Sequence, residues 1–391
     1  MDHRILILDG NQRAALASVR SLGSKGLWVA VGETSTPSLA GVSRFCSKQL
    51  RYADPFTSPR EFFENVLLQI RELGITFLLP VTEATTYVIL RYRSELPDSV
   101  VLPFPVSEAV EKVANKNALF GLARSQNIPI PETVACNSVD DGLSVLETID
   151  NFPVVLKPFK SRILRDDAII SSQVIVAHSK EEAQAALQSH SFFRFPFTIQ
   201  SFVEGFGQGV FALFDHGQPR CYFAHRRLRE KPPGGGVSVL SESSQVNETL
   251  KASAEKLLHT VGWHGVAMVE FRVAQDGTGY LMEINPRFWG SLQLAIDSGV
   301  DFPWLLYLVS VGERLPEVKS HYGQLRWLLG DLDRLYLVMK APGTVYSAAA
   351  KILEILRFLK PGLRTRHEVN RLNDLRPFWF ELKHYLLALR K

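Results

Sequence analysis

The chain has 391 residues, of which 46% are apolar and 21% charged. This length and composition predict a soluble globular protein of two or three domains, and exclude a collagen-like, coiled-coil or disordered chain. Its three cysteines, Cys46, Cys136 and Cys221, are widely spaced. They argue against a disulfide scaffold and a zinc cluster, and favour a reducing, cytoplasmic location.

The net charge of +4 is unevenly distributed, because residues 331–391 hold 12 Lys and Arg against 6 Asp and Glu. Such a basic end is either a solvated helical face or a surface that docks on a membrane, a nucleic acid or an acidic partner. The N-terminal apolar run has no cationic leader or cleavage site, so we interpret it as a first strand rather than a signal peptide. The later apolar stretches fall short of the ~20 residues that a membrane span needs.

Apolar runs at residues 4–9, 27–31 and 77–81 alternate with helical periodicity. This alternation predicts βαβ units and a parallel sheet. The turn after the first run carries a single glycine, so we expect no dinucleotide site there. Pro103 and Pro105 interrupt the pattern, and we place the end of this αβ domain at residue 105.

The rest of the chain mixes predicted strands and helices. Helices are expected at residues 108–126 and 247–261, and strands at residues 152–158, 197–203, 209–214, 237–240, 266–273 and 279–285. Beyond residue 330 the periodicity indicates amphipathic helices, as at 348–359. We therefore predict an α/β protein with domains at 1–105, 106–195 and 196–325, and a basic helical extension at 326–391.

The strongest chemical signal is the segment VAMVEFRVAQDGTGYLMEINPRFWGS. Two strand-like runs flank Asp276-Gly277, a dipeptide favoured in hairpin turns. A hairpin centred there puts Glu270 opposite Glu283, and strand alternation puts Asn285 on the same face as Glu283. Two carboxylates and an amide oxygen suit Mg²⁺ or Mn²⁺. The alternative is a solvent-facing strand pair with incidental acids, which a register slip of one residue would produce.

Several cations could serve an anionic ligand near these carboxylates. Arg287 follows Asn285 by two residues and would stabilise a transferring phosphoryl group, or would pair with one of the same acids. Lys116 lies in a predicted helix, and Lys157 ends an apolar strand. A buried ammonium needs a counter-charge, which a nucleotide phosphate or a neighbouring carboxylate would supply.

A further candidate is the polar end of the strand at 197–203, where the backbone could meet an adenine edge and Glu204 a ribose. Another is the segment HRRLREKPPGGG, which combines cations with a glycine run. On a regular strand Arg227 and Arg229 share one face. We interpret the segment as a substrate or phosphate clamp with a mobile loop. A nucleic-acid patch is the competing interpretation, but no aromatic-interleaved basic groove accompanies it.

In chain order, these segments resemble the ATP-grasp superfamily. The matching set comprises Lys116 before a P-x-P turn, Lys157 in VVLKP, the hinge QSFVEG, Glu270 in VEF, and MEINPRFWGS. The first domain is similar to the Rossmann-like domain that precedes the ATP-grasp fold, which has two subdomains. The segment HRRLREKPPGGGVSV is similar to the subgroup of carboxylate–amine ligases and carbamoyl-phosphate-synthase-like proteins.

The resemblance implies a role for each matching residue. Lys116 and Lys157 would hold phosphates of ATP, and Glu270, Glu283 and Asn285 would bind two Mg²⁺ ions. The remaining implied roles are adenine binding by Gln200, Ser201, Phe202 and Val203, ribose binding by Glu204, phosphoryl stabilisation by Arg287 and Arg229, and a substrate lid formed by Arg227, Lys231, Gly235 and Gly236. The loop at 159–168 departs from the family pattern because it lacks glycines.

The resemblance implies an ADP-forming ligase that activates a small-molecule carboxylate as an acyl phosphate and joins it to an amine. We expect no nucleic acid as partner; peripheral docking through the basic end and a homodimer stay open. One alternative is a catalytically silent ATP-binding protein that regulates or scaffolds a biosynthetic complex. Another is a kinase that releases its phosphorylated product.

Overall fold

A four-stranded parallel sheet forms the N-terminal part of the computed structural model, which describes residues 3–165, 167–360, 362 and 365–389. In sheet order its strands are β3 (Lys48–Arg51), β2 (Trp28–Glu33), β1 (Arg4–Ile7) and β4 (Phe77–Leu79). The helices that alternate with them are α1 (Arg13–Ser24), α2 (Pro59–Leu73) and α3 (Glu83–Arg91). The predicted βαβ arrangement is confirmed. Successive residues of β1 face opposite cores, so Leu6 packs in one and Ile7 in the other.

Two short helices link this sheet to the next domain. A single helix was expected over 108–126, but the structure has α4 (Ser107–Ala114) and α5 (Lys116–Ser125). Asn115 between them is extended, and its side chain accepts hydrogen bonds from the N–H groups of Asn117 and Ala118. This cap starts a new helix at Lys116.

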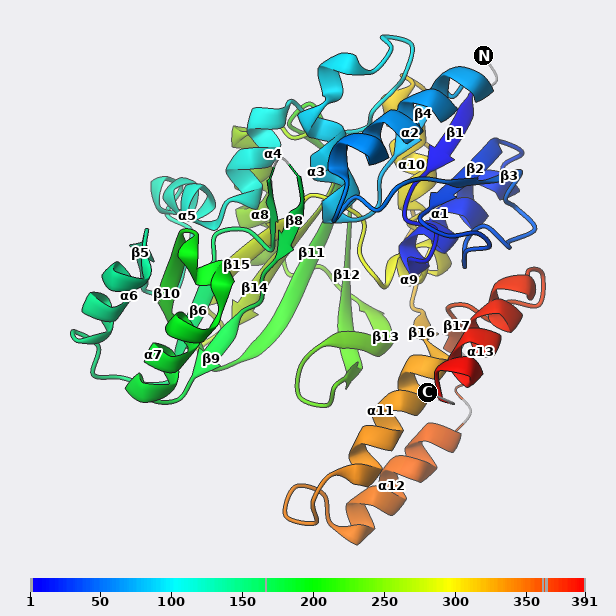
Figure 1. Cartoon of the computed structure of the whole chain (residues 1–391). Coiled ribbons are helices and arrows are strands. Elements are labelled where there is room, and N and C mark those ends of the chain that lie inside the picture. Colours follow the sequence, from blue (N-terminus) through cyan, green and yellow to red (C-terminus); the bar gives the residue numbers. More distant parts are fainter. Residues whose placement is uncertain (1–2, 166, 361, 363–364, 390–391) are drawn as a thin grey trace.

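A small antiparallel sheet forms a separate lobe with its own core, seen on the left in Figure 1. Its strands, in order, are β5 (Thr133–Cys136), β10 (Phe197–Ser201), β6 (Val154–Pro158) and β9 (Ile175–Ala177). Helices α6 (Val139–Leu146) and α7 (Lys180–Ser189) pack on it. A hairpin of β7 (Arg162–Leu164) and β8 (Ile169–Ser171) follows β6 and belongs to the glycine-poor loop, of which Asp166 lies outside the described residues.

A seven-stranded sheet forms the centre of the molecule (Figure 1). Its strands, in order, are β15 (Gly279–Asn285), β14 (Gly265–Val273), β11 (Phe206–Asp215), β12 (Gln218–Lys231), β13 (Val237–Ser244), β16 (Gln324–Arg326) and β17 (Thr365–His367). Helices α8 (Glu248–Thr260), α9 (Leu292–Asp297) and α10 (Phe302–Ser310) pack against it. Alternation along β11 sends Ala212 into one core and Phe211 into the other.

The C-terminal region contains α11 (Leu328–Lys340), α12 (Ala348–Leu359) and α13 (Arg376–Ala388). Helices α11 and α12 form a hairpin that projects from the body at the bottom of Figure 1. The region is not only helical, because β17 pairs with β16 at the edge of the central sheet. It also contacts the N-terminal domain, since Arg20 Nε donates to Asp374 Oδ2 at 2.9 Å. Among the described residues, no helix combines the length and apolar character that crossing a membrane requires.

Candidate active site

Strands β14 and β15 pair in the predicted register at Glu270, Glu283 and Asn285. Glu270 on β14 lies directly opposite Glu283 on β15. Asn285 lies two residues further along β15, and its amide nitrogen donates to Glu283 Oε1 at 3.2 Å. The carboxylates and the amide therefore share one patch of the sheet.

The turn of this hairpin differs from the prediction. A hairpin centred on the Asp276-Gly277 dipeptide would pair Phe271 with Met282, but Phe271 pairs with Leu281. Met282 is an extra residue in a β-bulge, and beyond it the register returns to the predicted one. The bulge also has a chemical consequence, because Met282 and Glu283 both line the same cavity. The sulfur of Met282 lies 3.5 Å from Lys157 Nζ.

Three cations from different elements surround the carboxylates. Lys116 Nζ, at the start of α5, lies 3.3 Å from Glu283 Oε2. Arg227 Nη2, on β12, lies 3.7 Å from Glu270 Oε1. Lys157 near the end of β6 is buried, and its side chain reaches the same cavity as both glutamates. The structure thus brings both predicted lysines and one predicted arginine to the acidic hairpin.

The two glutamates have opposite electrostatic environments. Burial, reinforced by the charge of Glu283, raises the pKa of Glu270 to about 7. Burial also disfavours the charge on Glu283, but Lys116 and Lys157 outweigh it and hold its pKa at about 2. Burial lowers the pKa of Lys157 to about 8. Divergent pKa values among neighbouring groups are typical of functional sites.

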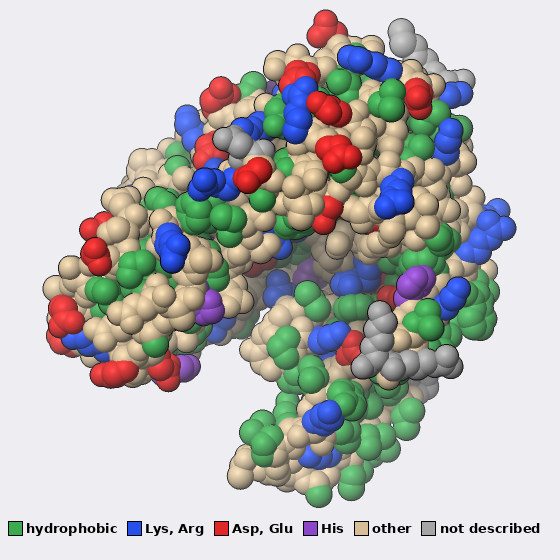
Figure 2. Space-filling view, in the orientation of Figure 1, with side chains coloured by type: hydrophobic (Ala, Val, Ile, Leu, Met, Phe, Trp, Pro, Cys, Tyr) green, Lys and Arg blue, Asp and Glu red, His purple; other side chains and the backbone are tan. Residues whose placement is uncertain are grey.

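Three cavities join into one cleft along this patch. The first, of about 270 Å³, reaches from Lys157 to Glu283. The second, of about 250 Å³, shares Glu270 and Glu283 with it and extends to Arg287. The third, of about 540 Å³, shares Arg287 with the second and is lined largely by the N-terminal domain. Figure 2 shows the hollow in this face of the molecule, with Lys and Arg side chains at its back. The cleft therefore runs from the small lobe, past the carboxylates, to the parallel sheet.

Arg287 lies where the second and third cavities meet. Its Nη2 donates to Asn285 Oδ1 at 3.2 Å and lies 3.6 Å from Glu83 Oε1 at the start of α3. The alternative role foreseen for Arg287 was an ion pair with Glu270 or Glu283. The ion pair in the structure is instead with the N-terminal domain, which leaves the guanidinium lining both cavities.

The predicted hinge lies beside a different cavity. Gln200 is buried and donates to Thr133 Oγ1 at 2.9 Å. The next four predicted residues line a cavity of about 520 Å³, and they are Ser201, Phe202, Val203 and Glu204. Arg272 connects this cavity to the cleft, because its side chain lines the cavity of Lys157 and its Nε donates to Val203 O at 3.1 Å.

Arg229 and Lys231 do not join the carboxylates. A bulge in β12 pairs Arg227 with Ser241 but Arg229 with Leu240, so the two arginines no longer share a face, and that prediction is wrong. Arg229 Nη2 instead lies 2.7 Å from Asp331 Oδ2 on α11, and Lys231 pairs with Asp333.

Two glycines, Gly235 and Gly236, belong to the predicted lid. Both Gly235 and Gly236 are exposed, and Gly236 also lines the second cavity. Gly236 has φ +145, and a Cβ there would lie 2.3 Å from Lys231 O. Only glycine fits that position without a shift in the backbone.

Sequence reasoning missed two residues of the cleft. Arg13 lines the second and third cavities, and its guanidinium lies between the ring of Trp327, 3.7 Å away, and Glu368 Oε2, 2.9 Å from Nε. No local pattern around Arg13 indicates this role. His225 is buried, and its Nε2 lies 2.8 Å from Ser291 Oγ. Its position two residues before Arg227 on one strand was a signal that could have been used.

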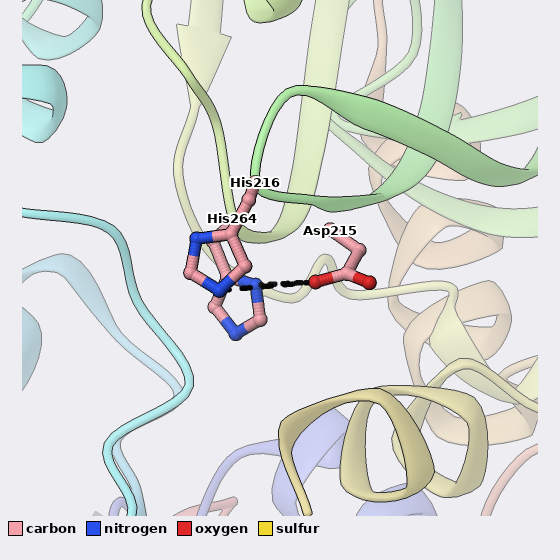
Figure 3. A group of neighbouring side chains, drawn as sticks. All are labelled: Asp215, His216 and His264. Carbon is pink, nitrogen blue, oxygen red and sulfur yellow. Dashed lines mark ion pairs between the residues drawn. The ribbon is translucent and has the colours of Figure 1, made fainter. Parts of the chain in front are cut away.

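A second group of polar side chains lies where the β11–β12 turn meets the start of β14 (Figure 3), and none of its three residues lines the cavities of the cleft. Asp215, His216 and His264 bring one potential metal-ligand atom each to within 4.8 Å of the others. Asp215 Oδ2 is already paired with Arg220 Nη2 at 2.7 Å, and Asp215 Oδ1 lies 3.4 Å from His264 Nδ1. These contacts account for the cluster without a metal ion.

Comparison with protein families finds one match, over residues 212–327, to the family described as ATP-grasp in the biosynthetic pathway with Ter operon. That stretch includes the acidic hairpin and β12. The chain is also similar to the arginine-specific large chain of mitochondrial carbamoyl phosphate synthase from Schizosaccharomyces pombe. The two are 22% identical over 252 residues, which is 62% of this chain and 21% of the relative. The similarity thus spans about a fifth of that protein's length.

Solved structures share the fold over most of the chain. N5-carboxyaminoimidazole synthetase from Staphylococcus aureus aligns with a TM-score of 0.65 and 13% identity, covering 86% of this chain and 84% of that one. L-amino acid ligase from Bacillus licheniformis aligns with a TM-score of 0.62 and 15% identity, covering 82% and 79%. The biotin carboxylase domain of Hydrogenobacter thermophilus 2-oxoglutarate carboxylase, in complex with MgADP, ADP and bicarbonate, aligns with a TM-score of 0.63 and 13% identity, covering 82% and 73%. At these identities the likeness concerns the fold.

Proposed function

We propose that the chain is an ATP-grasp protein and acts as an ATP-dependent, ADP-forming ligase that joins a carboxylate to an amine or similar nucleophile through an acyl phosphate. The observation that carries this proposal is the opposition of Glu270 and Glu283 in a cleft lined by cations. Like charges directly opposite each other are destabilising, and a bound cation turns that repulsion into attraction.

The donor set of the cleft fits a hard divalent cation. Glu270 and Glu283 offer carboxylate oxygens and Asn285 an amide oxygen, which are ligands that Mg²⁺ and Mn²⁺ prefer. A divalent ion held by these residues together with the nucleotide would neutralise phosphate charge. The raised pKa of Glu270 fits this assignment, because burial and the charge of Glu283 raise it and a bound cation would offset both.

In this proposal the two lysines bind the phosphates of the nucleotide, and the hinge residues bind its adenine and ribose. Lys116 and Lys157 reach the carboxylate patch from α5 and β6, so they would bind the phosphates. The hinge residues Gln200 to Val203 would bind the adenine and Glu204 the ribose, since Arg272 connects their cavity to the cleft. Arg229 has no part in this assignment, because it lines none of the four cavities described above and its guanidinium pairs with Asp331.

The third cavity is the proposed site of the acid and the nucleophile. It is lined by guanidinium groups of Arg13, Arg162 and Arg287 and by carboxyl groups of Glu33 and Glu83. Charges of both signs suit a carboxylate substrate and an amine substrate side by side. Arg287, at the junction with the second cavity, would hold the carboxylate towards the nucleotide.

The proposed reaction has two steps. A carboxylate oxygen attacks the γ-phosphorus, the bond from that phosphorus to the β,γ-bridging oxygen breaks, and ADP leaves. The amine nitrogen next attacks the acyl carbon, phosphate leaves, and the nitrogen loses a proton. Arg287 and Arg227 line the cavity where charge develops on the phosphoryl oxygens, and both would stabilise it.

Hydroxylamine trapping tests the proposal against both alternatives. The protein would be screened with ATP, Mg²⁺ and small carboxylic acids by thermal shift, and each stabilising acid would then be incubated with hydroxylamine. ADP together with an acyl hydroxamate supports the ligase. A stable phosphorylated product without hydroxamate indicates a kinase, and ATP binding without turnover for any acid indicates a regulatory protein.

A further inference from the structure

Helix α12 presents its apolar residues outward. The buried residue of this helix is Glu354, whereas five apolar residues are exposed, namely Ile352, Leu353, Ile355, Leu356 and Leu359. The exposed fraction reaches 59% for Ile352 and 66% for Leu359. Ile352, Ile355, Leu356 and Leu359 have the i, i+3, i+4, i+7 spacing of a single stripe. In a globular protein such a stripe normally faces the core, so here it calls for a partner outside the chain.

Polar contacts explain why the helix is held in this orientation. Glu354 Oε2 accepts a hydrogen bond from Arg334 Nη1 of α11 at 2.6 Å. Lys351 Nζ donates to the carbonyl oxygens of Met339 and Ala341 at the end of α11, at 2.8 and 2.7 Å. Lysine at a helix C-terminus satisfies free carbonyls and complements the helix dipole. Charged residues therefore hold α12 against α11, and the apolar stripe of α12 is left exposed.

The exposed apolar surface extends over the hairpin. Helix α11 adds Leu332, Tyr336 and Leu337, and Val345 lies in the connection, where 66% of it is exposed. Figure 2 shows hydrophobic side chains gathered on this projection at the bottom of the molecule. We call this set, together with the α12 stripe, the hairpin apolar surface.

The unpaired charged groups at the ends of the hairpin helices are basic. All six acids of residues 331–391 are engaged by partners within the protein. Their partners are Arg229 for Asp331, Lys231 for Asp333, Arg334 for Glu354, Arg13 for Glu368, Arg20 for Asp374 and Trp327 for Glu381. By contrast Lys340 at the end of α11 and Lys360 directly after α12 are exposed and form no ion pair with any residue that the structure describes. The inward acids leave the outer surface basic.

We propose that the α11–α12 hairpin docks on an anionic lipid surface, with the α12 stripe entering the boundary between headgroups and acyl chains. A helix with an apolar face and a basic rim binds such surfaces in the plane of the bilayer. The same chemistry disfavours a second copy of the chain, because a two-fold contact would bring Lys340 and Lys360 of both copies together. This inference does not depend on the proposed reaction.

Vesicle sedimentation with the full chain tests the inference. The protein should sediment with vesicles of phosphatidylcholine and phosphatidylserine, and remain in solution with phosphatidylcholine alone. The combined variant Ile352→Ser, Leu356→Ser should lower the apparent affinity about tenfold or more, since it removes two aliphatic side chains that would enter the bilayer. Lys360→Glu should lower it as well, and added salt should weaken binding of the parent protein.

Leu68→Ser with Val134→Ser is the matched control, because these residues are 54% and 45% exposed elsewhere on the protein. Its binding should equal that of the parent. Thermal melts check that each variant is folded. Equal binding to phosphatidylcholine alone, or no binding to either vesicle, overturns the inference. Light scattering provides a further check: a dimer that the Ile352→Ser, Leu356→Ser variant converts to a monomer identifies a second copy as the occupant instead.

Discussion

The cleft and the α11–α12 hairpin both set carboxylates against basic side chains, with different geometry. In the hairpin region Arg334 lies 2.6 Å from Glu354, and Arg229 lies 2.7 Å from Asp331. Around Glu283 and Glu270 in the cleft, the nearest ion-pair distances are 3.3 and 3.7 Å, and the two carboxylates face each other. The hairpin charges are closely paired with one another, whereas the looser contacts of the two cleft carboxylates are what the proposed metal and nucleotide site requires.

Arg227 and Arg229 display this difference within one strand. A bulge separates them, so Arg227 contacts Glu270 in the cleft while Arg229 contacts Asp331 on α11. Electrostatic conflict persists at a functional site only when the rest of the fold stabilises it. The comparison teaches that the same residue type, two positions apart on one strand, contacts α11 on one face and the carboxylates of the cleft on the other.

The largest expected effect separates activity from stability in the cleft. Glu270→Gln should reduce turnover about 10³-fold, because it removes a proposed metal ligand. The same change should raise Tm at pH 8, since the raised pKa of Glu270 shows that its charge opposes folding. ADP release and thermal melts at one pH measure both effects.

Glu283→Gln is the matched variant. It should reduce turnover similarly but lower Tm, because the depressed pKa of Glu283 shows that its charge is stabilised by Lys116 and Lys157. Full turnover in either variant would remove the metal assignment. Tm shifts of equal sign would contradict the opposite environments of the two carboxylates.

The sequence predicts those side chains of the cleft that follow the regular alternation of a strand. Glu270, Glu283 and Asn285 could be placed because strand residues alternate around a recognisable turn. The bulges at Met282 and after Arg227 could not be foreseen, because each depends on packing with neighbouring strands.

Tertiary contacts also override local periodicity in the hairpin. The amphipathic pattern of α12 predicts a helix correctly, but not that Arg334 would turn Glu354 inward. The partnership of Arg13 with Glu368 spans most of the chain and leaves no local pattern in the sequence.

The next effect should be confined to stability. Asp331 is buried against Arg229 and Arg326, so Asp331→Ala leaves two guanidinium groups without a counter-charge. Loss of one partner from a buried pair costs about 3–5 kcal/mol of unfolding free energy. Denaturant melts should show this loss, while turnover per folded molecule should stay that of the parent.

Glu317→Ala is the control for Asp331→Ala. Glu317 pairs with Lys319 where 77–78% of each side chain is exposed, and exposed pairs are worth about 1 kcal/mol or less. A similar loss of stability in both variants would show that the Asp331 network is no more than a surface pair. A large loss of turnover in folded Asp331→Ala would return Arg229 to the active site.

A smaller effect concerns the stability of the protein at acidic pH. Burial, with a further contribution from Arg227, lowers the pKa of His225 to about 3, so the unfolded chain binds this proton more readily between pH 6.5 and 3. Stability should therefore fall as pH falls below 6.5, by at most about 1.4 kcal/mol per pH unit from this residue. His225→Gln should reduce that slope in denaturant melts at pH 5–7. His178→Gln, at an exposed histidine of the small lobe, is the control.

The smallest effect distinguishes a helix cap that serves the cleft from one that does not. Asn115 caps α5 by accepting from two backbone N–H groups, and Asn247 caps α8 in the same way. Asn115→Ala and Asn247→Ala should each cost about 1 kcal/mol of unfolding free energy. Lys116 is the first residue of α5, so only Asn115→Ala should also raise the KM for ATP, by a few fold. Equal KM values in the two variants, at equal losses of stability, would mean that the position of Lys116 does not depend on its helix and that Glu283 alone holds its ammonium group.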